Sequence, residues 1–182
     1  ALQRAGQNTD WPVYGGSPSG IRYSELKQIN RSNVKQLQVA WTFDTDEGPG
    51  GTQNQPLVVD GVLYAVTPKH NVVALDAATG KLRWKFEPGV TGRGANRGMS
   101  YWSEGGEQRL FTSVQHWLYA LDPATGKPIP SFGKDGRVDL REGLGRDPAK
   151  QSILLTTPGV VYKDLLIVGG RTSEGLPATP GD

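Results

Sequence analysis

Short apolar runs separated by turn residues fill most of the chain from residue 56 onward. Residues 72–75 and 82–86 are rich in aliphatic, β-branched and aromatic side chains, and Asp76-Ala-Ala-Thr-Gly80 lies between them. Upstream, residues 56–67 contain two more apolar runs, which meet at Asp60-Gly61. An Asp-Gly pair between apolar runs is a strong hairpin signal, because glycine takes positive φ without steric cost. Residues 57–86 therefore predict about four short antiparallel strands.

This unit repeats along the chain. The stretch from Ala74 to Trp84 recurs in degraded form from Ala120 to Pro130, 46 positions later. A period of this length with a turn inside each copy indicates propeller blades or another repeat array, and four short antiparallel strands per copy make one blade. The fold class predicted is therefore all-β. Candidate strands of a second blade are residues 99–102, 109–114, 117–121 and 129–132.

A third blade begins at Ile153 and continues through residues 160–168, with a turn at Lys163-Asp164. No third Ala-x-Asp-x-x-Thr-Gly segment follows, so this blade is predicted to lack its last two strands. Before the first blade, residues 32–37 predict one helical turn with Ser32 as its N-cap, and residues 39–43 predict a single strand that closes the ring against a last blade.

The predicted organisation is one propeller domain in four parts. They are a lead-in with the closing strand at 1–44, a blade at 45–90, a blade at 91–135 and an incomplete blade at 136–182. Twelve of its apolar residues are expected to be mostly buried: Leu57, Val59, Leu63, Ala65, Val73, Leu75, Trp84, Leu110, Leu118, Ala120, Leu165 and Ile167.

Composition narrows the function classes. The chain has 182 residues with 25 Gly and 13 Pro, which suits a turn-rich β fold. It has no cysteine, which excludes disulfide and thiol chemistry. A net charge of +2 without a basic run argues against a nucleic-acid partner. Open blades expose apolar sheet faces, so we expect self-association or contact with the remainder of a propeller.

The first forty residues contain motifs that resemble those of a known family. Asp10-Trp-Pro-Val-Tyr-Gly-Gly16, Arg22-Tyr-Ser-x-Leu26 and Ala40-Trp41, followed by the Ala-x-Asp-x-x-Thr-Gly repeat, resemble the dehydrogenases that depend on pyrroloquinoline quinone (PQQ). The resemblance covers essentially the whole chain. It implies an eight-bladed propeller with the quinone near its axis, of which this chain supplies the N-terminal strand and just under three blades.

The resemblance also implies a function. The expected reaction is PQQ-dependent oxidation of a sugar or alcohol hydroxyl by hydride transfer to the quinone, with Ca²⁺ as a second cofactor. Electrons would pass to a respiratory quinone or a cytochrome, in the bacterial periplasm, with membrane association through a further segment left open. The family's proton-abstracting carboxylate belongs to a later blade. The alternatives are a non-catalytic binding or scaffold propeller, and an inactive fragment of the dehydrogenase.

Arg97, in Asn96-Arg-Gly98, matches the family arginine that bonds the quinone and stabilises its reduced form. A guanidinium suits this role because it stays charged and presents a planar fork of donors. The ordinary alternative is a loop arginine. In the alcohol-oxidising branches a cysteine pair precedes this arginine, whereas this chain has Gly92-Arg-Gly-Ala95. That difference favours the glucose-dehydrogenase-like branch, or a site without the disulfide.

The other site residues are also carried over from the family. Gln53 stands where the family has a glutamate that contacts the cofactor, and simple loop polarity explains it equally well. Thr112, Thr156 and Thr157 are candidate hydroxyl donors to the cofactor carboxylates, although threonine is common in strands. Glu174 is the candidate Ca²⁺ ligand, and a solvated loop glutamate is the alternative.

Two residue types receive structural interpretations. His70 and His116 lie near hairpin tips without a partner at metal-ligand spacing, so both are expected to be solvated. Trp41 and Trp84 are expected to dock between adjacent blades. Pro130 stands where Trp84 does in the first copy, so the docking contact is weaker there.

Overall fold

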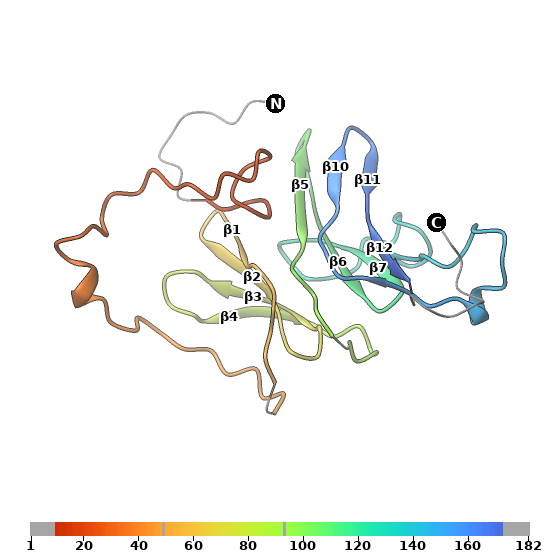
Figure 1. Ribbon diagram of the computed structural model, residues 1–182, viewed down its shortest axis with the longest axis horizontal. Helices are drawn as coiled ribbons and strands as arrows, with labels where there is room; N and C mark the ends of the chain where they lie inside the picture. Colours follow the sequence, from red (N-terminus) through yellow and green to blue (C-terminus); the bar gives the residue numbers. More distant parts are fainter. Residues whose placement is uncertain (1–9, 49, 93, 173–182) are drawn as a thin grey trace.

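The computed structural model describes residues 10–48, 50–92 and 94–172 (Figure 1). Within these residues all the longer elements are β-strands. The helices among them are two single 3₁₀ turns, η1 at Val34–Gln36 and η2 at Pro148–Lys150. The all-β prediction is therefore confirmed. No helix of the described residues is both long enough and apolar enough to cross a bilayer.

The first blade is the predicted four-stranded meander. Its strands β1 (Leu57–Val59), β2 (Val62–Val66), β3 (Val72–Asp76) and β4 (Leu82–Phe86) are antiparallel and adjacent in chain order. At the β1–β2 turn, Asp60 and Gly61 have φ of 49° and 71°. Positive φ at both positions is the conformation of the tight hairpin turn that Asp-Gly favours.

The second blade is also a four-stranded antiparallel sheet, in the order β5 (Ser100–Glu104), β6 (Glu107–Val114), β7 (Trp117–Leu121) and β8 (Arg137–Asp139). Its fourth strand was predicted at residues 129–132, and that prediction is wrong. The sheet extends instead to Asp139.

Proline explains the misplaced strand. Pro128 and Pro130 flank Ile129 and supply no N–H groups for a ladder. Ile129 N–H donates to the carbonyl of Ala120 at 2.8 Å, and Phe132 N–H then donates to the carbonyl of Ile129 at 3.0 Å. The chain therefore turns at residues 129–132, and the strand forms after a further loop.

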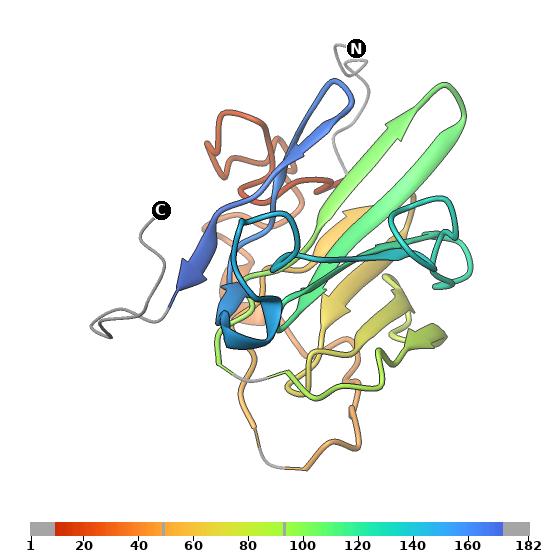
Figure 2. The ribbon, with the colours of Figure 1, turned by 90° about the vertical axis from the view of Figure 1, so that its right-hand side faces the viewer.

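The third unit is an interrupted hairpin. β9 (Ile153–Leu155) pairs with β12 (Gly170–Thr172), and β10 (Val160–Tyr162) pairs with β11 (Leu165–Ile167) around Lys163, whose φ is 55°. The start at Ile153 and the turn at Lys163-Asp164 are confirmed. The two views place this hairpin beside β5, with which β10 is in contact (Figures 1 and 2).

Burial follows the prediction in the two complete blades and fails in the hairpin. Seven predicted residues are buried, namely Leu57, Val59, Val73, Leu75, Leu110, Leu118 and Ala120. Leu63, Ala65 and Trp84 are half-buried. Leu165 and Ile167, in contrast, are 58% and 56% exposed. Strand alternation leaves these two on one face of β11 and the half-buried Leu166 on the other.

The main core lies between the first two blades. It joins residues of β1 to β3 with residues of β6 and β7, and Met99 completes it just before β5. Met99 is 1% exposed, and Leu57 and Leu110 are fully buried. The edge-to-face pair of Phe86 and Tyr119, with ring centroids 5.2 Å apart, adds an aromatic contact from β4. The two blades are thus a single packing unit.

The lead-in departs from the sheets as a long loop, drawn in red to orange in Figure 1. Residues 39–43 form no strand, because no described strand pairs with their backbone. The predicted helical turn exists, but Asn33 rather than Ser32 is its N-cap. Ser32 N–H instead donates to the Asn30 side chain at 2.9 Å.

Trp41 fastens the end of this loop to the first blade. Its Nε1–H donates to the carbonyl of Ala77 at 3.2 Å, and its ring covers Gly80 in the Asp76–Gly80 turn. A Cβ on Gly80 would lie 2.5 Å from the indole. The docking interpretation of Trp41 is confirmed.

Candidate functional site

Three of the segments that carry predicted site residues lie close together in space. Four antiparallel strands bring the chain out of a blade at the end where it entered. The segments before β1 (52–55) and before β5 (94–98) therefore lie at the same end, and a hydrogen bond between Arg97 and Thr156 brings the segment after β9 (156–157) beside them. This topology places Gln53, Arg97 and Thr156 in one region.

Main-chain hydrogen bonds across the blades hold Arg97. Gln55 N–H donates to the carbonyl of Arg97 at 3.1 Å, and Arg97 N–H donates to the carbonyl of Thr156 at 2.9 Å. Gly98 forms a parallel bridge with Gln55, and a Cβ on Gly98 would lie 2.9 Å from the Gln55 carbonyl oxygen. Only glycine allows this close approach, and its φ of 130° also requires glycine. Arg97 is thus tied to all three units of the chain.

The buried side chain of Asn96 also holds this loop in place by hydrogen bonds. It is 4% exposed, its Nδ2 donates to the carbonyl of Ser113 at 3.0 Å, and its Oδ1 accepts from Gly98 N–H at 3.0 Å. The Arg97 side chain is exposed, and its guanidinium has no ion pair or hydrogen bond with another described residue. A fixed main chain with an unpaired guanidinium suits the binding of an anion.

Thr112 offers an unused donor nearby. It is 2% exposed in β6, and its hydroxyl has no hydrogen-bond partner among the described residues. It adjoins Ser113, which accepts from Asn96 and whose own hydroxyl donates to the carbonyl of Leu155 at 3.4 Å. A buried hydroxyl without a partner costs about 1–3 kcal/mol. Such a group is a reasonable candidate for contact with a ligand.

The remaining predicted residues differ in how closely they approach Arg97. Thr156 is half-buried and meets Arg97 through its carbonyl, whereas Thr157 and Gln53 are exposed and none of their side chains makes a hydrogen bond to a described residue. Glu174 lies outside the described residues. Within the described part of the chain, no group of three His, Asp or Glu residues could hold a metal ion.

Two polar residues near Arg97 escaped the sequence analysis. Gln55 contributes the contact to Arg97 described above, and its Oε1 accepts from Gly15 N–H at 3.3 Å. Asn54 donates to the carbonyl of Val66 at 2.6 Å, and its Oδ1 is buried without a partner in the described chain. The signal was the polar run Thr52-Gln-Asn-Gln55 directly before a buried strand.

The two histidines are not solvated as expected. His70 is 6% exposed, in the turn between β2 and β3, and its Nε2 lies 3.2 Å from the carbonyl oxygen of Gly94. The prediction for His70 is therefore wrong. His116 is half-buried, and burial together with the nearby Arg141 guanidinium lowers its pKa.

Comparison with known proteins identifies relatives of this arrangement. Residues 11–181 match the family described as "PQQ: Glucose/ethanol/alcohol dehydrogenase, beta-propeller domain". The chain is 44% identical over 173 residues to the dehydrogenase subunit of an alcohol dehydrogenase (quinone) from Gluconacetobacter polyoxogenes, covering 91% of this chain and 22% of that protein. It is 32% identical over 203 residues to quinoprotein glucose dehydrogenase A of Acinetobacter calcoaceticus, covering 91% and 24%.

A solved structure has the same fold. The quinohemoprotein alcohol dehydrogenase from Comamonas testosteroni superposes with a TM-score of 0.74 at 30% identity, over 92% of this chain and 24% of that one. The chain thus spans about a quarter of the length of the relatives that it matches.

Proposed function

The chain belongs to the PQQ family of glucose/ethanol/alcohol dehydrogenase β-propeller domains, and we propose that its protein oxidises the hydroxyl of an alcohol or a sugar. The observation that carries the proposal is Arg97, with its main chain fixed between the blades and its guanidinium unpaired among the described residues. When bound, PQQ supplies the electrophilic carbon that accepts hydride from the substrate.

The residues of this chain bind and orient that cofactor. PQQ carries three carboxylates, and Arg97 presents a charged fork of donors to an anion. The buried hydroxyl of Thr112 has no partner among the described residues and can donate a hydrogen bond, and the Thr156 carbonyl accepts from Arg97 N–H. Gln53 and Thr157 are exposed at the same end and are proposed as outer contacts.

Calcium is proposed as the second cofactor, with Glu174 as a ligand. A carboxylate oxygen suits Ca²⁺, which polarises an oxygen of its ligand as a Lewis acid. Because Glu174 lies outside the described residues, the proposal rests on the family membership alone.

The substrate class and the redox partner are also proposals. Relatives named for glucose and for alcohol are both similar to this chain, and the lack of a cysteine pair before Arg97 is the feature that favours the glucose-like branch. We propose a respiratory quinone or a cytochrome as the electron acceptor, and the periplasm as the location.

The test is a titration of the full-length apoprotein with PQQ in the presence of Ca²⁺, followed by the cofactor's absorption. Saturable binding, with hydroxyl-dependent reduction of the bound cofactor, is expected. The absence of binding at millimolar Ca²⁺ would reject the dehydrogenase and favour a propeller that only binds or scaffolds. Comparing glucose with ethanol as the reductant then decides between the two branches.

A further inference from the structure

We infer that His70 is a positioning residue for Arg97, acting across the interface between the first two blades through the loop that leads to Arg97. The inference rests on the proposed function, since it assigns a role to the residue that sets the proposed PQQ contact. Sequence analysis placed His70 at a solvated hairpin tip. The structure buries it against residues 92 and 94 instead.

Main-chain hydrogen bonds close the turn that carries His70. His70 has a φ of 64°, a left-handed conformation that histidine adopts more readily than most residues. His70 N–H donates to the carbonyl of Thr67 at 2.9 Å, and Thr67 N–H donates to the carbonyl of Asn71 at 2.9 Å. These bonds fix the direction in which the imidazole leaves the turn.

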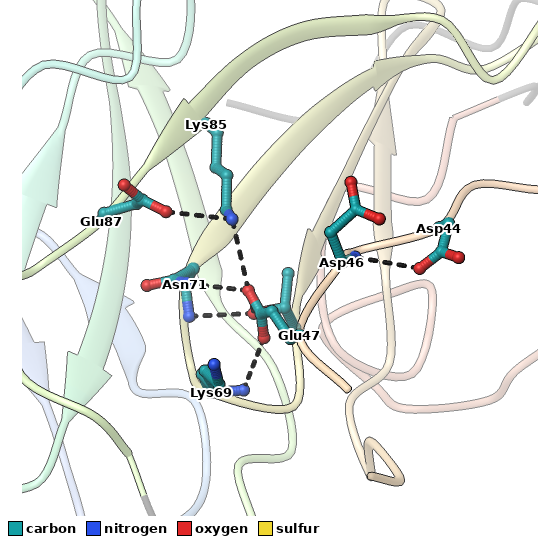
Figure 3. A network of polar contacts seen from close by, with 8 residues as sticks. Asp44, Asp46, Glu47, Lys69, Asn71, Lys85 and Glu87 are labelled. Carbon is teal, nitrogen blue, oxygen red and sulfur yellow. Dashed lines mark hydrogen bonds and ion pairs between the residues drawn. The ribbon is translucent and has the colours of Figure 1, made fainter. Parts of the chain in front are cut away.

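Glu47 clamps the same turn from the lead-in side (Figure 3). Its Oε1 accepts from Thr67 Oγ1 at 2.8 Å and from Asn71 Nδ2 at 2.7 Å, and its Oε2 accepts from Lys69 N–H at 2.8 Å. Its side chain is 3% exposed, and Lys85 Nζ approaches it at 3.5 Å. Three of the five residues from Thr67 to Asn71 are therefore held by one buried carboxylate.

The imidazole meets the loop before Arg97 at two glycines. His70 Nε2 faces the carbonyl oxygen of Gly94, so Nε2 is the protonated nitrogen and donates. A Cβ on Gly92 would clash with Cγ and Nδ1 of the His70 ring and with the His70 Cβ. Gly92 does not have a left-handed φ, so it is glycine here for space rather than for backbone freedom. Gly92 N–H also donates to the carbonyl of Lys69 at 2.9 Å.

Through the His70 imidazole and the Lys69 carbonyl, the β2–β3 turn of the first blade holds residues 92 and 94 of the loop before Arg97. Further along, Asn96 bonds Ser113 of the second blade, and Arg97 bonds Gln55 and Thr156. Removing the ring would remove the contact at Gly94, so between the Gly92–Lys69 hydrogen bond and Asn96 the segment would lose its hold on the first blade. A shift of about 1 Å at a binding group is enough to cost up to a hundredfold. His70 thus sets the approach of the Arg97 side chain.

The experiment uses the full-length protein and the variant His70→Asn. Asparagine keeps the left-handed turn but lacks the Nε2 that contacts the Gly94 carbonyl. Lys163→Asn is the matched control, because Lys163 also has positive φ in a hairpin turn but lies in the β10–β11 hairpin. We expect His70→Asn, and not the control, to speed hydrogen exchange at the Gly92 and Arg97 amides in the apoprotein. We also expect it to weaken PQQ binding by roughly tenfold, within the range of a small misplacement.

A double-mutant cycle with Arg97→Lys separates positioning from general damage. If His70 acts through Arg97, His70→Asn weakens PQQ binding in the Arg97 background and has little further effect in the Arg97→Lys background. Equal weakening in both backgrounds, or none in either, overturns the inference. If Arg97→Lys alone leaves PQQ binding unchanged, the proposed function loses its cofactor contact. The exchange of the Gly92 and Arg97 amides then still shows whether His70 holds the loop.

A reciprocal substitution covers the case in which His70→Asn unfolds the protein. Gly92→Ala places a methyl group against the imidazole, and we expect it to weaken PQQ binding by roughly tenfold or more. Glycine at position 70 removes the Cβ and Cγ that this methyl group would meet and accepts the left-handed φ, so the double variant His70→Gly/Gly92→Ala should bind PQQ more tightly than Gly92→Ala alone. Strictly additive losses would mean that the two residues do not act through one contact, and would also overturn the inference.

Discussion

The indole of Trp84 lies flat against Gly126 of the next blade, and a Cβ on Gly126 would lie 2.5 Å from the ring. Trp84 Nε1–H donates to the carbonyl of Pro123 at 2.9 Å, and Tyr64 Oη donates to the same carbonyl at 3.3 Å. Trp41 repeats this arrangement on Gly80 one blade earlier. The glycine of the repeat therefore has two roles, in its own turn and as the docking surface for the preceding tryptophan.

Gly126→Ala should destabilise the protein more than a glycine substitution in a free turn. Gly61→Ala is the matched control, because both glycines have a φ of 71° but a Cβ on Gly61 meets open space. Left-handed strain of about 1–2 kcal/mol applies to both variants. Overpacking against Trp84 should add about 1–3 kcal/mol to Gly126→Ala. Chemical denaturation measures the difference, and equal losses in the two variants would refute docking as a source of stability.

Glu47 gives the protein a stability that depends on pH. Burial alone would raise the pKa of Glu47, but hydrogen bonds from Thr67, Lys69 and Asn71 and the charge of Lys85 lower it below the usual 4.5. A carboxyl whose pKa is lowered on folding stabilises the folded state above pH 4.5, and this contribution disappears as the pH falls below it.

Glu47→Gln should accordingly cost about 1.5–3 kcal/mol at neutral pH, as expected for lost hydrogen bonds to a buried charge. The difference from wild type should shrink on acidification below pH 4.5. Glu87→Gln is the control, because Glu87 also pairs with Lys85, at 3.0 Å, but its side chain is 65% exposed. Unfolding curves at several pH values provide the measurement. A loss for Glu47→Gln that is independent of pH would contradict the assignment.

The two complete blades could be predicted from sequence because their signals are local. Asp60-Gly61 specifies one hairpin, and the Asp76–Gly80 turn uses the side chains expected of it, with Thr79 N–H donating to Asp76 at 3.0 Å. Predictions from the apolar pattern failed where the structure of a segment depends on whether another element packs against it. Residues 39–43 have strand composition but no adjacent strand, and Leu165 and Ile167 have core composition but are more than half exposed.

The candidate site shows the same division. Family motifs located Arg97, and the chain order of the blades explains why Thr156 is near it. They could not show that Gln55, rather than Gln53, bonds the main chain of Arg97, because that contact depends on the register between two blades. The burial of His70 could not be predicted from the sequence either, because it depends on the space beside Gly92, which belongs to a different blade.

Thr112→Val tests whether a buried hydroxyl is kept for a ligand. Valine has nearly the shape of threonine, and the Thr112 hydroxyl has no partner among the described residues. Removing it should leave the apoprotein as stable as wild type or more stable by up to about 1 kcal/mol. PQQ affinity should fall by about tenfold, the equivalent of one hydrogen bond of about 1.4 kcal/mol.

The control for Thr112→Val is Thr67→Val, in which the lost hydroxyl donates to Glu47. That variant should lose stability in the apoprotein. Thermal melts of the apoproteins and PQQ titrations of the full-length variants give both quantities. If Thr112→Val destabilises the apoprotein and binds PQQ normally, the hydroxyl has a structural role and is not a ligand contact.

Arg97→Lys tests the proposed function most directly. Lysine retains the positive charge but lacks the planar fork, so a paired contact to the cofactor cannot form. Because the main chain of residue 97 is held by Gln55 and Thr156, and its side chain is exposed, the fold should be unaffected. Loss of a charge-assisted contact that strengthens in the transition state should cost roughly 2–4 kcal/mol. Turnover at saturating PQQ should therefore fall on the order of a hundredfold.

Arg83→Lys is the matched control. Arg83 is an exposed arginine of β4 that forms a 2.9 Å ion pair with Asp76, and a lysine can form the same pair. It should change neither the melting temperature nor the turnover appreciably, as surface ion pairs contribute little. Steady-state rates of the full-length variants, measured at equal cofactor occupancy, decide the matter. Wild-type turnover in Arg97→Lys would show that Arg97 is an ordinary loop residue. The main structural support for a quinone site at this end of the blades would then be lost.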